Sequence, residues 1–222
     1  MKKLFVALAC AVALNAQAGV IVDNSITGSV VNNFNAMATG AVAGLIVDVG
    51  ARYGERFAGQ TVTNVGGFDA VTGAPTSLTL LANANTADNI GILLNGGSNV
   101  LYGDLSSQIG EGAVSVLLGA RSDVFGFNMV GTDGGNFLIE FFAADGSSIA
   151  SITQGAMNSF FGFRTTGGSQ IWGVTITNTD PAGLAFDNVQ FNQGRGEVPE
   201  PASLALLGLG LFGLVAARRR KQ

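Results

Sequence analysis

Residues 171–177, with the sequence IWGVTIT, decide the fold class of this 222-residue chain. Large apolar residues alternate with small or polar ones here, and successive side chains of a β-strand point to opposite faces. Trp172, Val174 and Ile176 therefore share one face, which we expect to contact a hydrophobic core. The stretch predicts a strand with one buried side, and it makes a core position the favoured interpretation for Trp172.

The second half of the chain repeats such segments at short intervals. We expect strands at 124–130, 136–143, 148–153, 160–164 and 184–191, separated by turns rich in glycine, asparagine and aspartate. The chain contains 33 glycines and few helix signals. This organisation predicts an all-β domain, built as an antiparallel β-sandwich or jelly roll.

The first half is less regular. We expect one or two strands within 19–35, strands at 77–82, 90–94 and 100–102, and a central strand at 113–118. Residues 48–60 are interpreted as a surface loop with a short strand and residues 66–75 as turns, whereas 36–47 fits a strand or a short helix. One β-sandwich ectodomain is thus predicted at 19–191, followed by a linker at 192–197.

Residues 1–18 have the composition of a Sec signal peptide. A basic start precedes the apolar residues 4–14, and Ala16 and Ala18 form an A-x-A cleavage site for signal peptidase. The mature chain is expected to begin at Gly19 after passage through the Sec translocon. Cys10 is the sole cysteine and lies within the removed segment, so we expect no disulfide, thiol nucleophile or thiolate metal site in the mature protein.

The C-terminal segment 198–222 has three parts in a fixed order. An uncharged apolar run at 202–217 lies between two short motifs, Val198-Pro199-Glu200-Pro201 and Arg218-Arg219-Arg220-Lys221. As a helix the run is about 24 Å long, and local thinning and snorkelling arginines can fit it to a hydrocarbon core of ~30 Å. The basic cluster predicts a cytoplasmic C-terminus. A plain membrane anchor is the alternative, but an anchor alone does not need the two prolines.

This order of motifs resembles the PEP-CTERM sorting signal of Gram-negative bacteria. The resemblance implies that an exosortase, a membrane cysteine protease-transpeptidase, cleaves near Pro199-Glu200-Pro201 and releases the protein to the cell surface or the extracellular matrix. Residues 49–191 also resemble ectodomains often found on PEP-CTERM proteins, through phrases such as those at 53–60, 125–127, 160–163 and 186–189. That second resemblance implies a lectin-like sandwich without naming a ligand.

Charge excludes one class of partner. Five arginines, no lysine and 15 acidic residues remain between positions 19 and 200, which gives this region a net charge of −10. Nucleic acids and anionic lipids are bound by clustered basic residues, so we expect no nucleic-acid partner. The acidity is typical of a soluble secreted protein that repels its own copies.

The absence of histidine from the chain argues against most enzyme classes. Without it there is no Ser-His-Asp or Cys-His nucleophile and no histidine metal ligand. Glycoside hydrolysis needs only two carboxylates, and Glu55, Glu111 and Glu140 are candidates. Their spacing brings no two of them together, so we expect a protein that is not an enzyme.

Calcium is the metal that an acidic, asparagine-rich chain is best suited to bind, because its ligands are oxygens. Asp187 and Asn188 lie in the expected last strand, which resembles the aspartate-containing last strand of lectin-like carbohydrate-binding modules. There the aspartate helps to hold a structural calcium beside the N-terminal strand, where this chain offers Asp23. Ordinary turn or strand-edge hydrogen bonds are the alternative interpretation, and no other cofactor is expected.

Sugar binding would use aromatic faces. Tyr53 and Tyr102 lie near glycine-rich loops where exposure is expected, and Trp172 is the third candidate despite its core-like position. Two hypotheses follow. The first is a non-catalytic structural or adhesive protein of the cell envelope or the exopolysaccharide matrix of a biofilm, held in the membrane through 202–217 until it is processed. The second is a carbohydrate-binding module.

Overall fold

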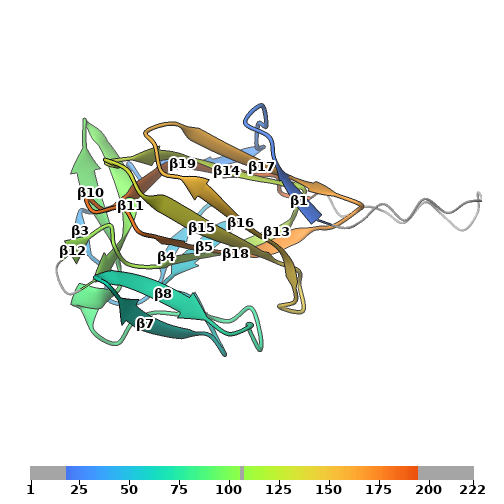
Figure 1. Ribbon diagram of the computed structural model, residues 1–222. Coiled ribbons are helices and arrows are strands. Elements are labelled where there is room, and N and C mark those ends of the chain that lie inside the picture. Colours follow the sequence, from blue (N-terminus) through green and yellow to red (C-terminus); the bar gives the residue numbers. More distant parts are fainter. Residues whose placement is uncertain (1–18, 106–107, 195–222) are drawn as a thin grey trace, which may run out of the picture.

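The computed structural model describes residues 19–105 and 108–194, which form an all-β domain (Figure 1). Every strand pair in it is antiparallel, as the sequence predicts, and most strands belong to two sheets that face each other. The predicted jelly-roll connectivity stays a prediction. Within the described ranges no helix has the length and apolarity to cross a membrane.

The larger sheet has nine strands, in the order β1-β17-β14-β19-β11-β10-β3, with β12 paired to β11 and β2 paired to β19. Its members are β1 (Gly19–Val22), β2 (Val30–Asn32), β3 (Gly40–Ala41), β10 (Ile90–Asn95), β11 (Ser98–Leu105), β12 (Gln108–Ile109), β14 (Val124–Val130), β17 (Phe160–Thr166) and β19 (Ala185–Phe191). The last strand of the domain is therefore a central strand. Along its length β14 lies on one side, and β11 and then β2 lie on the other.

The smaller sheet has six strands in the order β16-β15-β18-β13-β5-β4. They are β4 (Ile46–Asp48), β5 (Ala51–Gly54), β13 (Val114–Ser122), β15 (Asn136–Phe142), β16 (Ser148–Gly155) and β18 (Ile171–Asn178). Two short ladders lie beside it, β6 (Arg56–Phe57) with β9 (Leu80–Leu81), and β7 (Thr61–Val65) with β8 (Phe68–Thr72). A 3-10 turn, η1 (Thr86–Asp88), completes the described elements.

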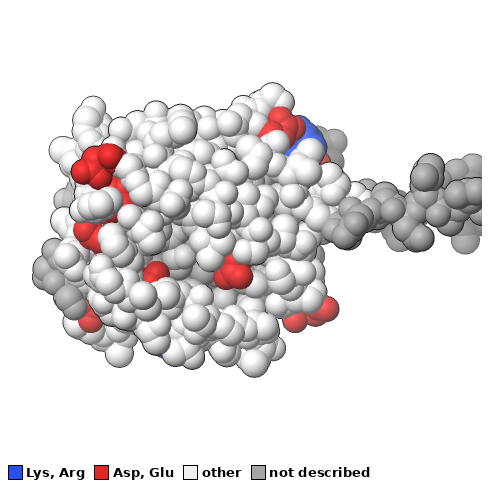
Figure 2. Space-filling view, viewed as in Figure 1, with Lys and Arg blue, Asp and Glu red and all other residues white. Residues whose placement is uncertain are grey.

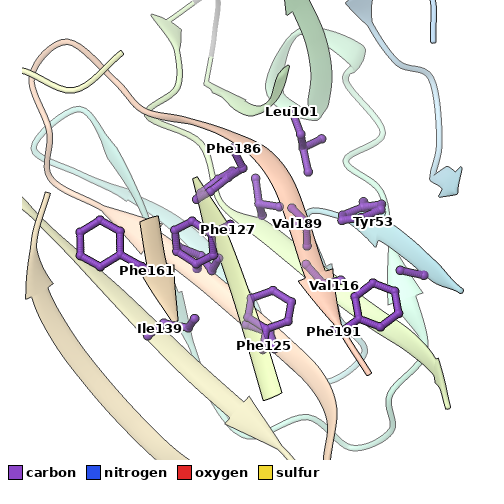
Figure 3. Close-up of a cluster of buried hydrophobic side chains, with 14 of the residues drawn as sticks. Tyr53, Leu101, Val116, Phe125, Phe127, Ile139, Phe161, Phe186, Val189 and Phe191 are labelled. Atoms are coloured by element: carbon purple, nitrogen blue, oxygen red, sulfur yellow. The ribbon is translucent and has the colours of Figure 1, made fainter. Parts of the chain in front are cut away.

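Phenylalanine rings fill the space between the two sheets (Figure 3). Phe127 of β14 is central, with Phe137 of the facing sheet at a centroid distance of 5.9 Å and Phe186 at 5.1 Å. Most of these pairs are edge-on or tilted, the arrangements that ring quadrupoles favour by ~0.5–1.5 kcal/mol beyond burial. Alternating residues of β14 and β15 supply the rings, so the core follows directly from the sequence pattern.

Paired glycines let the N-terminal segment cross the outer face of the larger sheet. Gly126 of β14 and Gly162 of β17 are directly opposite each other in the ladder. A Cβ atom at Gly126 would lie 2.9 Å from Ile26 Cδ1, and one at Gly162 would lie 2.3 Å from the Asp23 carbonyl oxygen. Ile26, 5% exposed, occupies the space that the missing side chains leave. The segment then continues to β2, which pairs with β19.

Two sequence predictions about the first half are wrong. Residues 48–60 are not a surface loop, because β5 pairs with β13 and places Tyr53 in the main core, while Phe57 packs on Leu80 and Phe142. Residues 66–75 contain a five-residue strand, β8, as well as turns. In both places pairing with distant strands outweighs the local glycine and charge content.

Strand β13 connects two opposite ends of the domain. At its start the Ala113 amide contacts β8, and near its end the Arg121 carbonyl accepts a hydrogen bond of 2.9 Å from the amide of Gly194. At ~3.3 Å per strand residue, these ends are about 25 Å apart. The chain leaves the domain at the Arg121 end, towards residues 195–222. The predictions for 1–18 and for 195–222 lie outside the described residues.

Candidate functional site

A polar cleft of ≈ 480 Å³ lies at the end of the domain that is opposite Gly194. It is bounded by the β5–β6 junction, the β7–β8 hairpin and the segment from β9 to η1. Acidic and amide side chains dominate it, and those that matter most are Glu55, Arg56, Gln60, Asp69, Asn83 and Asp88. On the face shown in Figure 2, acidic side chains are more numerous than basic ones.

Glu55 is held from both its backbone and its carboxylate. It follows β5, and its amide donates to the Leu81 carbonyl at 3.0 Å while its carbonyl accepts from the Ser115 hydroxyl at 3.1 Å. The carboxylate forms an ion pair with Arg56 and accepts a 2.7 Å hydrogen bond from Asn83 Nδ2. Glu55 is 1% exposed, so these contacts provide the partners that a buried carboxylate requires.

Buried Asn89 fixes the segment that carries Asn83. Its Nδ2 donates to the carbonyls of Val42 at 2.7 Å and Gly44 at 2.8 Å. Its Oδ1 accepts from the Asn83 amide at 3.0 Å. These bonds join the segment between β9 and β10 to the loop between β3 and β4, and they set the position from which Asn83 reaches Glu55.

Asp69 enters the cleft from β8 and is 4% exposed. Its amide donates to the Glu111 carbonyl at 3.1 Å, and its Oδ2 accepts from the Ala113 amide at 2.9 Å. Burial raises the pKa of this carboxyl from 3.8 to about 6, and the negative charges of Glu55 and Asp88 add to the increase. The cleft therefore contains a carboxyl group that exchanges its proton near neutral pH.

Gln60 lies between β6 and β7 and is 6% exposed. Its Oε1 accepts a 2.9 Å hydrogen bond from the Phe57 amide, which determines how the side-chain amide is oriented. The Nε2 atom is buried and has no hydrogen-bond partner among the described residues. The wall of the cleft thus contains two buried carboxyl groups, those of Glu55 and Asp69, and the buried side-chain amide of Gln60.

The structure does not bring the predicted calcium ligands together. Asp23 follows β1 and its carboxylate binds Ser25 and Arg164, contacts that lower its pKa to about 2. Asp187 lies on β19 and accepts from the hydroxyl of Ser98 and the amide of Asn188. Strands β17 and β14 separate β1 from β19, a distance of about 14 Å at the usual strand spacing. No cluster of three acidic, histidine or cysteine residues suited to a metal occurs within 19–105 and 108–194.

The two tyrosines expected near the surface are buried, so that part of the sugar-binding prediction needs correction. Tyr53 is 0% exposed, with its hydroxyl accepting a 2.8 Å hydrogen bond from Asn32 Nδ2, and Tyr102 is 4% exposed beside Val100 and Ala185. Neither ring face is free to stack on a sugar. The flanking glycines are compatible with exposure. Both tyrosines, however, lie on strands that pair with neighbouring strands, and both side chains are buried.

Trp172 is half-buried instead of being a full core residue. Ile171 and Val174 are both 0% exposed and belong to the core. An irregularity in the β13–β18 register, between Leu117 and Ser122, permits this departure from simple alternation. The half-buried position of Trp172 thus depends on how β18 pairs with β13, which the pattern of β18 alone does not indicate.

The three glutamates considered for catalysis occupy different places. Glu55 shares the cleft with Asp69 and Asp88, neighbours that sequence spacing did not predict. Glu111 contributes its carbonyl to Asp69 and is itself 8% exposed. Glu140 lies on β15 of the six-stranded sheet, where burial raises its pKa. Sequence reasoning missed Asp69, Gln60 and Asn83, because a buried polar residue in a short strand or loop has no distinctive sequence signal.

Comparison with known proteins gives one result. A family model for the PEP-CTERM protein-sorting motif matches residues 197–221. No curated protein and no solved structure gives a significant match to this chain.

Fold and motif together define an exported all-β protein that is sorted through its C-terminus. More specifically, the chain carries a PEP-CTERM protein-sorting motif, which confirms the resemblance seen in the sequence and contains both Val198-Pro199-Glu200-Pro201 and the basic end. The motif implies an exosortase as processing partner and the cell surface as destination.

Proposed function

We propose that this protein is a non-catalytic structural or adhesive component of the bacterial envelope or of its exopolysaccharide matrix. The observation that carries the proposal is the PEP-CTERM motif at 197–221, joined to an all-β domain whose core is rich in phenylalanine. A protein that acts at a cell surface needs a stable domain and a sorting signal. The PEP-CTERM motif supplies the signal, and the two packed sheets supply the stable domain.

The proposed route has three steps. The Sec translocon exports the chain, and signal peptidase cleaves after Ala18. Residues 202–217 then hold the protein in the membrane with the basic cluster in the cytoplasm. Finally an exosortase cleaves near Pro199-Glu200-Pro201 and transfers the domain to the surface of a Gram-negative cell.

A non-catalytic role is supported by the composition of the chain, which has no histidine and no cysteine beyond Cys10. In the cleft, the carboxylate of Glu55 is occupied by Arg56 and Asn83. A second candidate function, a lectin-like carbohydrate-binding module, is favoured by the polar cleft, and no longer by the tyrosines.

The sorting part of the proposal is tested in an exosortase-containing host that expresses the full chain with an epitope in the exposed turn at 96–97. Wild type is expected in the surface and matrix fractions with a reduced mass. The triple variant Pro199→Ala, Glu200→Ala, Pro201→Ala should stay in the membrane fraction uncleaved, as should wild type in an exosortase deletion. Gln193→Ala, just outside the motif, is the matched control and should be processed normally.

The role itself is tested by deleting the gene and comparing biofilm cohesion and envelope integrity. We expect weaker cohesion that is restored by wild type but not by the triple variant. Unchanged processing of the triple variant would refute the sorting step. Unchanged cohesion and envelope integrity in the deletion strain would refute the structural or adhesive role, and release of reducing sugar by the purified protein would refute the non-catalytic assignment.

A further inference from the structure

The chain leaves the domain through a set of hydrogen bonds at its last described residues. Asn192 donates from its backbone amide to Ser122 Oγ at 2.8 Å, and its Nδ2 donates to Asp123 Oδ1 at 2.8 Å. The amide of Gly194 donates to the Arg121 carbonyl at 2.9 Å. The chain is therefore fixed to the turn between β13 and β14 as far as Gly194, and the following residues start from a defined place on the surface.

The side chain of Arg121 lies directly beside this exit. A Cβ atom at Gly194 would lie 2.7 Å from the Arg121 carbonyl oxygen, 2.8 Å from its Cγ and 3.4 Å from its Nε. Any larger residue at position 194 would collide with Arg121, so glycine is what permits the close approach. The guanidinium group is thus held next to the outgoing backbone.

A pocket of ≈ 370 Å³ opens at the same place. Among the described residues that line it, Arg121 is the only cation and Asp123 the only acid. Oδ1 of Asp123 already accepts the hydrogen bond from Asn192. A guanidinium group at a pocket wall is suited to a carboxylate, which it binds through charge-assisted hydrogen bonds. The remaining lining residues are uncharged, namely Ser29, Gln170, Asn192, Gln193 and Gly194.

The outgoing chain carries a carboxylate within reach of this pocket. Glu197 is the first acidic residue after Gly194 and follows it by three positions. At ~3.3–3.6 Å per residue, it lies within about 11 Å of Gly194 however the chain runs. A group attached this closely has an effective concentration in the millimolar range, which a separate ligand would have to exceed. A second copy of the chain is disfavoured because it has the same excess of negative charge.

We propose that the segment Arg195-Gly196-Glu197 docks in this pocket, with the Glu197 carboxylate bound to the Arg121 guanidinium. The processing motif that starts at Val198 then begins at the surface of the domain instead of after a free spacer. This inference goes beyond the proposed function, because the contact forms within the chain and depends neither on export nor on an exosortase.

Trypsin provides the test, because it cleaves after arginine and Arg195 lies within the segment that docks. The full-length protein, purified in detergent, is incubated with trypsin, and the product that ends at Arg195 is quantified by mass spectrometry. Each cleavage rate is divided by the rate for a synthetic peptide of residues 190–201 with the same substitution. This normalisation cancels the preference of trypsin for particular residues around its cleavage site.

Substitutions of the two charged partners should expose Arg195. Arg121→Gln and Glu197→Gln should each raise the normalised rate about two- to fivefold, the effect of losing a partly exposed ion pair. Exchanging the charges, with Arg121→Glu and Glu197→Arg together, should bring the rate back towards that of wild type. Arg52→Gln, at an exposed arginine of β5, and Glu200→Gln, beyond the segment, are matched controls and should be cleaved as wild type is.

Glu197→Gln is the deciding variant, because it changes no residue of the folded domain and so cannot fail through misfolding. An unchanged normalised rate in Glu197→Gln would overturn the proposal. An increase for Glu200→Gln alone would refute the choice of carboxylate, and a charge exchange that restores nothing would refute the pairing with Arg121. Protection of Arg195 that grows with protein concentration would assign the pocket to a second copy of the chain and would also overturn the proposal.

Discussion

The phenylalanine core and the polar cleft lie in the same domain but are constructed in opposite ways. In the core, alternating residues of long strands such as β14 and β15 supply rings that pack against each other. In the cleft, single residues from short segments supply polar groups, and their positions depend on hydrogen bonds to backbone atoms far away in sequence. The core depends on shape and burial, whereas the cleft depends on complete pairing of polar atoms. Unpaired buried polar atoms occur in both regions, on Gln60 in the cleft and on Asn32 beside Tyr53 in the core.

This difference predicts how each region responds to substitution. A core side chain loses packing in proportion to the atoms removed. A cleft side chain should change pH dependence or binding more than total stability, because its contacts are polar and partly replaceable. The following substitutions test whether the two regions are as distinct as the structure indicates.

The largest effect is expected for Phe127→Ala. Phe127 is fully buried and has ring neighbours from both sheets, so the substitution should lower the free energy of unfolding by ~3–5 kcal/mol. Urea denaturation of the protein gives the measurement, with Phe127→Leu as the control that retains most of the volume. A loss below about 1 kcal/mol for the alanine variant would mean that the core tolerates a cavity and is not close-packed.

A smaller effect is expected for Tyr53→Phe, which tests whether the core is uniformly apolar. The change leaves buried Asn32 Nδ2 without its 2.8 Å partner, so we expect a loss of ~1–3 kcal/mol. Adding Asn32→Leu removes the unpaired donor and should recover part of the loss. If Tyr53→Phe alone is neutral in urea denaturation, the hydrogen bond between Tyr53 and Asn32 does not contribute to stability and the core depends on apolar packing alone.

The effect of Asp69→Asn should appear mainly as a change in pH dependence. The folded protein holds the proton of Asp69 up to a pKa of about 6, whereas the ordinary value is 3.8. The stability from this group is therefore fully present below pH ~4 and is lost as the pH rises through about 6, for an expected total on the order of 1–2 kcal/mol. Asp69→Asn should flatten the stability curve between these values and be more stable than wild type at pH 8. Asp145→Asn is the control, and identical curves for wild type and Asp69→Asn would contradict the assignment.

Much of the two-sheet fold could be predicted from the sequence, because the strands of the second half are marked by local patterns of alternating residues and turns. The alternating rings of 124–130 and the turn at Asp145 and Gly146 are local signals, and the structure has strands and a turn there. The first half could not be predicted as well. Tyr53 and Phe57 lie among glycines and charges, and only their pairing with distant strands shows that they are buried.

The cleft was beyond sequence reasoning for a related reason. Glu55 is a candidate from the sequence, but its neighbours Asp69 and Asn83 come from strand β8 and from the segment after β9, and no spacing rule connects them. Asp23 and Asp187 show the reverse case, in which residues expected to be neighbours are not. The resemblance to lectin-like carbohydrate-binding modules places them at one calcium site, whereas the strand order of the larger sheet separates β1 from β19.

The central position of β19 has a mechanical consequence. A pull on the chain beyond Gly194 acts along a strand that is hydrogen-bonded on both sides, to β14 and to β11 and β2. If the opposite end of the domain is held at the cleft, the load runs parallel to the strands, and many backbone hydrogen bonds must shear at the same moment. An edge strand would instead peel away one bond at a time. The domain is therefore organised to transmit tension between its two ends without unravelling from its C-terminus.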